Sequence, residues 1–163
     1  MRKILALAVL MTAFAASESF AQSGNASASV AVTVTAQVTV TNVRGLNFGT
    51  HVQDSTAATV SANNGGTNAA YFTLQTSASH VSTVTYSNTA MTYSTGTINW
   101  TSSVVGSSSA ANQLSAATVG NNTTVTTNGS GYYYFWVGGT TDPITNTLPA
   151  GAYTGTFTLN VAY

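Results

Sequence analysis

The sequence predicts an all-β fold, an immunoglobulin-like antiparallel β-sandwich, and three observations favour it. Apolar and polar residues alternate along several segments, which is the period-2 pattern of half-buried strands. Glycine, asparagine and proline separate these segments, as turns do in sandwiches. Helix-favouring lysine, arginine and glutamate are almost absent, since the whole chain carries only three Lys+Arg and three Asp+Glu. Such a composition favours strands and turns.

The first residues, 1–21, are expected to be a secretory signal peptide. Arg2 and Lys3 precede a short apolar run, and Ser19-Phe20-Ala21 has the small-x-small form of a cleavage site. An uncleaved anchor is disfavoured, because an apolar run of ~13 residues is shorter than the ~20 that span a bilayer. In the remaining chain we expect an N-terminal extension over residues 22–34 and a single domain over residues 35–163.

The expected mature chain is nearly uncharged. Arg44, Asp54 and Asp142 are its only charged side chains, which leaves a net charge near −1. Such a surface does not attract nucleic acid or acidic lipid electrostatically. Low charge also removes the repulsion that keeps proteins apart, so we expect assembly or attachment to a surface. Cysteine is absent, so stability in an oxidising compartment must come from the core and the sheets.

The longest alternating run extends from Ala26 to Val43 and reads ASASVAVTVTAQVTVTNV. A typical strand has ~5 to 6 residues, so this run is roughly two to three times longer than a small domain covers. Two arrangements remain open. Either Gln37 to Val43 is a resident strand and the first half projects as an arm, or the whole run forms one long edge strand. An arm with this pattern is suited to complete the sheet of another molecule.

Further strands and turns follow from the same rules. Strands are predicted to begin at Leu46 and to cover residues 57–62, 70–76, 81–86, 90–93, 131–137 and 153–163. Turns are predicted at Asn42-Val43-Arg44-Gly45, Asn63-Asn64-Gly65-Gly66 and Gly138-Gly139-Thr140. Residues 95–125 contain one alternating pair, Ile98 and Trp100, and are otherwise predicted to be a surface excursion with at most a short helical turn.

Three segments carry a family resemblance: LNFGT at 46–50, the strand running into VGGT at 137–140, and the terminal AGAYTGTFTLNVAY at 150–163. Together they resemble the pilin-like bacterial surface domains related to the spore coat protein U group and to chaperone-usher fimbrial subunits. The resemblance implies a sandwich that lacks one strand, with a hydrophobic groove beside the C-terminal strand. It also implies that a periplasmic chaperone lends a strand during export, which the N-terminal extension of the next subunit later replaces in the fibre.

Carried onto this chain, the resemblance implies a donor strand and an acceptor edge. The donor side chains would be Ala28, Val30, Val32 and Val34. The acceptor edge would be Phe157, Leu159, Val161 and Tyr163, with the terminal carboxylate anchored on the chaperone. Burying four valine-sized side chains at ~1.5 to 3 kcal/mol each would more than offset unpaired groups that cost ~1 to 3 kcal/mol each. Strand donation is therefore expected to be tight and slow to reverse.

Enzymatic chemistry is not expected. Asp54 and Asp142 are the only side-chain carboxylates after the predicted leader, and Asp142 precedes a proline, where aspartate initiates turns. His51 and His80 have no cysteine or glutamate with which to form a metal site. The sequence contains neither a G-x-S-x-G elbow nor a phosphate-binding loop. We therefore expect no catalytic residue, no metal and no cofactor.

Two functions remain. The first is a structural subunit of a bacterial surface fibre (fimbria), exported through the periplasm, handled by a periplasmic chaperone and an outer-membrane usher, and joined to copies of itself or to other pilin-like subunits. The second is a monomeric secreted adhesin, or a carbohydrate-binding sandwich, that contacts a carbohydrate or an abiotic surface through exposed aromatics. Its candidate ligand platform is Trp100, Tyr132, Tyr134 and Trp136, because the strand GYYYFWV carries aromatics on both faces.

Overall fold

The computed structural model describes Ser29, Ala31, Val32 and residues 37–163. The chain divides into two units, Met1–Val34 and Thr35–Tyr163. The three described residues of the first unit are exposed and carry no regular secondary structure. The predicted leader and most of the predicted extension lie outside the described residues.

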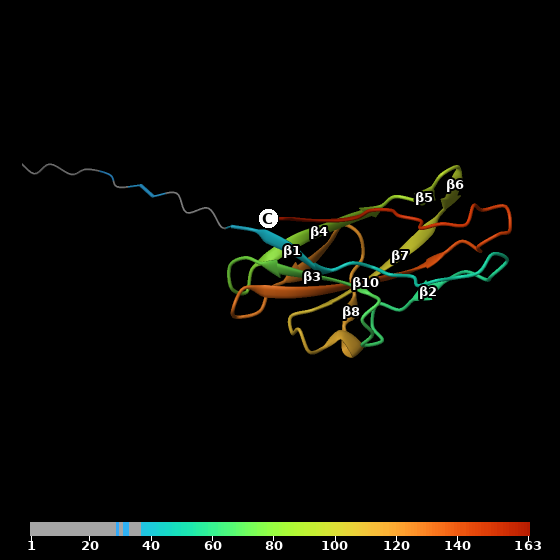
Figure 1. The fold of residues 1–163 in the computed structure, drawn as a ribbon. Helices are drawn as coiled ribbons and strands as arrows, with labels where there is room; N and C mark the ends of the chain where they lie inside the picture. Colours follow the sequence, from blue (N-terminus) through green and yellow to red (C-terminus); the bar gives the residue numbers. More distant parts are fainter. Residues whose placement is uncertain (1–28, 30, 33–36) are drawn as a thin grey trace, which may run out of the picture. The chain divides into compact units, whose positions relative to one another are not determined.

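The second unit consists of strands and one short 3₁₀ helix (Figure 1). In chain order its elements are β1 (Thr39–Arg44), β2 (Thr59–Val60), β3 (Ala70–Gln75), β4 (Val81–Asn88), β5 (Met91–Tyr93), β6 (Gly96–Ile98), β7 (Trp100–Ser107), η1 (Gln113–Ser115), β8 (Ala117–Thr118), β9 (Thr123–Thr126), β10 (Tyr132–Thr141) and β11 (Phe157–Ala162). Within the described part of the chain, no helix has the length and apolar character needed to cross a membrane.

Two antiparallel sheets form a sandwich. The larger sheet has the strand order β1-β3-β10-β7-β8, and β2 pairs with the end of β10. The smaller sheet has the order β11-β4-β9, and a separate ribbon joins β5 to β6. Every strand pairing is antiparallel. The structure therefore confirms the predicted all-β, antiparallel sandwich.

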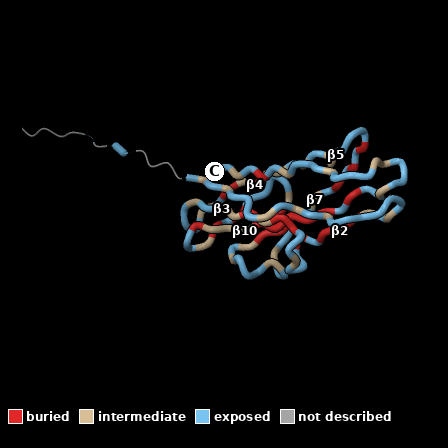
Figure 2. The backbone as a smooth tube through the Cα atoms, in the orientation of Figure 1, coloured by how far each residue is buried: buried red, intermediate tan, exposed pale blue. Residues whose placement is uncertain are grey.

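Alternate side chains of both sheets meet in one core. The larger sheet contributes Ala70, Phe72, Leu74, Val104, Phe135 and Val137, and the smaller sheet contributes Val84, Val125 and Leu159. In Figure 2 the buried segments, coloured red, concentrate along the strands around β10. The alternation that predicted β3, β4 and the first half of β10 thus corresponds to the alternate side chains that these strands direct into the core.

The predicted turn at Gly138-Gly139-Thr140 is wrong, because β10 continues through these residues to Thr141. A side chain on Gly138 would clash with the carbonyl oxygen of Val60, and one on Gly139 would clash with the carbonyl oxygen of Thr101. The two glycines therefore permit close approach of neighbouring backbones on either side of the strand.

Residues 95–125 are not a surface excursion, because β7 lies inside the larger sheet between β10 and β8. Val104, Val105 and Gly106 of β7 are buried in succession. The predicted short helical turn is present as η1. The prediction failed because a run of threonine and serine separates the buried Trp100 at the start of β7 from its short apolar centre.

Two predictions near β1 are also wrong. Residues 42–45 do not form a turn, since β1 continues to Arg44 and absorbs one extra residue as an irregularity between Asn42 and Arg44. No strand begins at Leu46, although its side chain still packs against the core. Gly49, in the same irregular segment, has a φ of 85° and donates its N–H to the side-chain oxygen of Asn47 at 2.8 Å.

Candidate functional site

The C-terminal strand β11 lies at the edge of the smaller sheet. Within the described residues its only strand neighbour is β4. Thr89, which follows β4, donates its N–H to the carbonyl oxygen of Thr156 at 2.8 Å. In an antiparallel ladder every second residue bonds to the same neighbour, so the backbone groups of residues 156, 158, 160 and 162 face β4. The backbone groups of the alternate residues, Phe157, Leu159 and Val161, consequently point to the side on which no strand is described.

Strand β1 forms the facing edge of the larger sheet. It pairs only with β3 among the described strands, and it lies beside β11. Val38 and Val40 are half-buried and pack against the core. We call this side of the sandwich the open seam and define it by Val38 and Val40 on one lip and Phe157, Leu159 and Val161 on the other.

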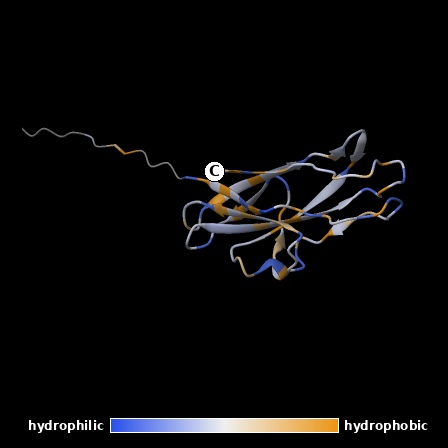
Figure 3. Ribbon diagram, in the orientation of Figure 1, coloured by the Kyte–Doolittle hydropathy of each residue, from blue (hydrophilic) through white to orange (hydrophobic). Residues whose placement is uncertain are grey.

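The inward side chains of the open seam are apolar and only partly covered. The ring of Phe157 lies 5.9 Å from that of Phe72, 5.8 Å from Tyr86 and 6.3 Å from Trp100, between centroids. Leu159 is 9 % exposed, whereas Phe157 and Val161 are half-buried. In Figure 3 hydrophobic colouring is concentrated in the strands near the C-terminal end. The seam is therefore an apolar strip with a free strand edge.

The fourth residue of the predicted acceptor edge, Tyr163, lies at the end of the seam. Its side chain is 51 % exposed. Its ring centroid lies 4.0 Å from that of His80, and its hydroxyl hydrogen-bonds the hydroxyl of Thr76. Gln75, which precedes Thr76, pairs with Thr39 at the start of β1. The chain therefore ends at the same end of the sandwich at which β1 begins.

On the opposite side of the sandwich β8 and β9 are the edge strands of the two sheets, and residues 119–122 join one to the other. Asn121 accepts the N–H of Tyr86 through its side-chain oxygen and donates to the carbonyl oxygen of Tyr86, each at 2.9 Å. Val119 is buried and donates its N–H to the carbonyl oxygen of Val104 at 2.9 Å. We call this side the closed seam, because the connection between its two edge strands hydrogen-bonds to both sheets, to Val104 of β7 and, beyond the end of β9, to Tyr86 of β4.

The structure divides the candidate aromatic platform into two places. Tyr132, Tyr134 and Trp136 lie on the outward face of β10 with Tyr71, at centroid distances of 6.2 Å for Tyr132–Tyr134, 6.3 Å for Tyr71–Tyr134 and 5.5 Å for Tyr71–Trp136. Trp136 is only 3 % exposed. Trp100 faces the other side of the sheet, is 8 % exposed, and donates its indole N–H to the carbonyl oxygen of Thr89 at 2.8 Å. Neither tryptophan presents an exposed face.

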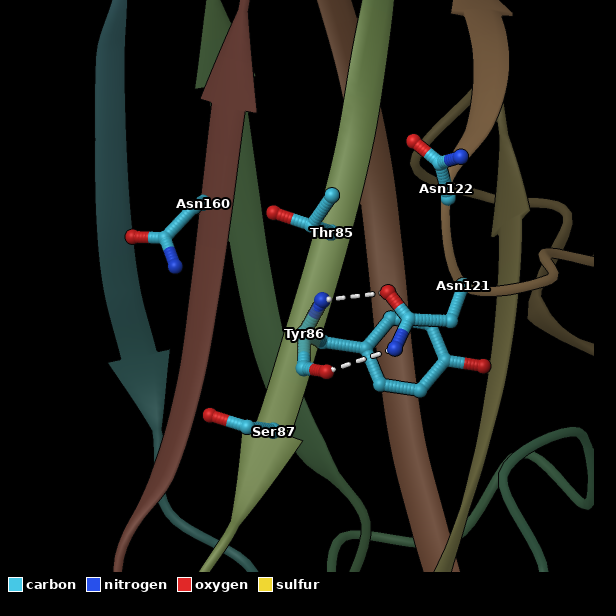
Figure 4. Close-up of a pocket in the computed structure, with 6 residues that line it drawn as sticks. All are labelled: Thr85, Tyr86, Ser87, Asn121, Asn122 and Asn160. Atoms are coloured by element: carbon cyan, nitrogen blue, oxygen red, sulfur yellow. Dashed lines mark hydrogen bonds between the residues drawn. The ribbon is translucent and has the colours of Figure 1, made fainter.

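A shallow pocket lies on the outward face of the smaller sheet, and the sequence reasoning did not identify it. Figure 4 shows the six residues that line it: Thr85, Tyr86, Ser87, Asn121, Asn122 and Asn160. They come from β4, from β11 and from the loop that joins β8 to β9. No sequence signal marks them, since threonine, serine and asparagine occur throughout the chain.

The ionisable side chains are dispersed. Asp142 accepts a hydrogen bond from the side chain of Asn99 at 3.1 Å, and Asp54 accepts one from the backbone of Asn146 at 3.1 Å. Among the described residues no three of the metal-binding types gather in one place. Burial raises the pKa of Tyr133. Burial also raises the pKa of Tyr71, as does neighbouring Tyr134, while Arg44 lowers it.

The acceptor-edge residues thus share one strand, while of the donor residues only Val32 is described, and Ala28, Val30 and Val34 lie outside the described residues. The sequence reasoning missed the contribution of Val38 and Val40, which share the phase of the donor residues along the same alternating run.

Comparison with known proteins gives one family and no named relative. No curated protein matches the chain. Residues 38–163, which span both sheets, match the model of a family described as "Domain of unknown function (DUF4402)". The chain therefore belongs to this family.

Proposed function

We propose that this chain is a structural subunit of a bacterial surface fibre, in which the N-terminal extension of one copy fills the open seam of the next. The open seam is the observation that supports the proposal. Two strand edges, β1 and β11, flank apolar side chains that the domain covers only in part. An extended segment laid along β11 would continue the smaller sheet and cover those side chains.

The free energy available in the open seam favours an extended segment with apolar side chains at alternate positions. The backbone groups of Phe157, Leu159 and Val161 offer hydrogen bonds worth ~0.5 to 1.5 kcal/mol each in net terms. Each valine-sized side chain that the occupant buries adds ~1.5 to 3 kcal/mol. The seam therefore suits an extended segment with small or branched apolar side chains at every second position, because alternate residues of a strand face the same side.

This chain contains such a segment. Ala28, Val30, Val32 and Val34 alternate with serine, alanine and threonine directly before the domain. Val32 is 84 % exposed. The segment lies on the same chain as the seam, so each copy supplies both a donor and an acceptor. A chain of identical subunits follows from this arrangement, because every donated segment leaves the donor's own seam free for the next copy.

Export and handling are part of the same proposal. The basic start, apolar run and cleavage pattern of residues 1–21 support secretion through the periplasm to the cell surface. An apolar seam on a nearly uncharged protein is prone to aggregate, since little charge keeps copies apart. A periplasmic chaperone that covers the seam and an outer-membrane usher that exchanges it for the next subunit would prevent this. Other pilin-like subunits are alternative partners.

The test compares the full chain with a variant lacking Gln22 to Val34. Electrophoresis without boiling should show a ladder of multiples for the full chain and a single monomer band for the deletion. A second variant, in which the same residues are replaced by a glycine-serine segment of equal length, should also be monomeric. Unchanged ladders from either variant would contradict the proposal, because they would show that assembly does not use these residues.

A further inference from the structure

The pocket on the outward face of the smaller sheet is separate from the open seam. The seam uses the inward side chains and the free edge of β11, whereas the pocket uses outward side chains of β4 and β11. Its volume is about 510 Å³, within the range of ~300 to 1,000 Å³ that is typical of small-molecule sites. A molecule bound there would therefore not compete with a donated strand.

The polar side chains of the pocket fall into two groups. The amide of Asn121 is fully occupied by the backbone of Tyr86. The side chains of Thr85, Ser87, Asn122 and Asn160, in contrast, make no hydrogen bond with any other described residue. Four uncharged polar side chains are thus free to bind a ligand, while Asn121 connects the loop after β8 to β4.

The geometry brings these free groups together. Thr85 and Asn160 are direct cross-strand partners, and such partners have Cβ atoms about 4.5 to 5.5 Å apart. Asn122 extends the pocket on the other side, and Figure 4 shows Thr85 between Asn160 and Asn122. Asn122 has a φ of 61°, in the left-handed region that non-glycine residues rarely adopt. The residues on both sides of Asn122 are held by hydrogen bonds. The Asn121 side chain bonds to the backbone of Tyr86, and the hydroxyl of Thr123 donates to the carbonyl oxygen of Gly120 at 2.7 Å.

We propose that this pocket binds a neutral carbohydrate. An amide presents a donor and an acceptor side by side, and a threonine or serine hydroxyl both donates and accepts. Sugar hydroxyls have the same dual capacity, so neighbouring hydroxyls can satisfy two of these side chains at once. No charged residue lines the pocket, so nothing there favours an anionic or cationic ligand over a neutral one.

Saturation-transfer NMR on the full chain tests the proposal with cellobiose, maltose and N,N′-diacetylchitobiose as probes. A disaccharide concentration of ~10 mM suits the Kd of ~1 mM expected for a shallow, open site. We expect transfer to at least one of the three. Thr85→Val and Asn160→Ala should weaken that binding at least ~10-fold, which is the loss expected when a ligand hydroxyl loses a partner.

A matched control and a second variant separate binding from folding. Thr126→Val changes an exposed threonine of β9 that does not line the pocket, and it should bind as the unaltered chain does. Asn122→Gly removes a side chain and also relieves the left-handed backbone, so it should fold at least as well and still lose binding.

Three outcomes would overturn the proposal: no transfer to any of the three disaccharides, equal binding by folded Asn160→Ala and Asn122→Gly variants, or equal binding of the anionic disaccharide digalacturonate. The proposal does not depend on fibre assembly. The variant lacking Gln22 to Val34 should bind the same disaccharide with the same affinity, so the two proposals fail independently.

Discussion

The two long sides of this sandwich differ in how their sheet edges are connected: β1 and β11 lie at the open seam, and β8 and β9 lie at the closed seam. At the closed seam a single side chain, Asn121, occupies both backbone groups of Tyr86, and the buried Val119 links the connection to β7. At the open seam the edges of β1 and β11 face no described strand. At the closed seam the short connection thus hydrogen-bonds to both sheets, whereas no described strand lies between the edges of β1 and β11 at the open seam. We infer that the open seam is reserved for an external strand.

The largest expected effect concerns the segment proposed to fill the open seam. Val32→Asp should abolish assembly, with a loss of more than ~100-fold in association, because a charge would be buried against apolar side chains. The matched control is Thr33→Asp, which adds the same charge at the alternate position and should assemble normally. Sedimentation velocity measures both. Equal assembly by the two variants would show that the alternation of the segment has no role.

The next effect concerns the lip of the open seam itself. Leu159→Ala should lower the free energy of unfolding by about 2 to 5 kcal/mol, the usual loss for a buried leucine. The half-buried Val161, changed to alanine, should cost less in the isolated domain. Urea denaturation of the chain lacking residues 22–34 measures both losses. A larger loss at Val161 than at Leu159 would mean that the seam is covered more completely than the structure shows.

At the closed seam the corresponding change is Asn121→Ala. It should cost about 1 to 2 kcal/mol, as expected for two hydrogen bonds of modest net value. Asn122→Gly is the matched control and should have a smaller effect, since the Asn122 side chain has no partner among the described residues and glycine adopts its φ of 61° without strain. Urea denaturation distinguishes the two. Equal losses would show that the hydrogen bonds of Asn121 do not stabilise β4 beyond the end of β9.

The smallest effect is a pH dependence at the closed seam. Burial raises the pKa of Tyr133, whose ring lies beside Gly106 and Val119. The folded protein therefore holds this proton more tightly than the unfolded chain, in which tyrosine titrates near ~10. The stability that Tyr133 contributes through this difference is fully present below pH ~10 and is lost as the pH rises through the raised pKa of the folded state. The urea midpoint should fall above pH ~10, and less so in Tyr133→Phe. An equal fall of the urea midpoint in Tyr133→Phe would show that Tyr133 is not the group responsible.

Much of the fold was predictable from alternation alone. β3 buries every second residue over most of its length and β4 does so in its first half, so their sequences show the period directly. One glycine pair misled the prediction. Gly138 and Gly139 resemble a turn in sequence, but they lie within β10 and let the backbones of Val60 and Thr101 approach closely. β7 was missed because its buried centre is short.

The candidate sites were predictable to different extents. Alternation in the last strand placed Phe157, Leu159 and Val161 on one face, and the structure packs that face against the core. Their role as an acceptor edge came from the resemblance and stays a prediction. That β11 lies at the edge of its sheet depends on pairings between distant segments, which the sequence did not specify. The pocket around Asn122 and Asn160 was not predictable, since its residues come from three elements and are common throughout the chain.

Hydrogen exchange at β11 tests the open seam most directly. The measurement uses the chain lacking residues 22–34, with and without a peptide of residues 22–36, and reads the backbone amides of Phe157, Leu159 and Val161. We expect these three amides to exchange rapidly without the peptide and to be protected with it, while Thr158 and Asn160, which bond to β4, are protected in both states. Slow exchange of the amides of Phe157, Leu159 and Val161 without the peptide, or no change on its addition, would show that the edge of β11 is not open to an added strand.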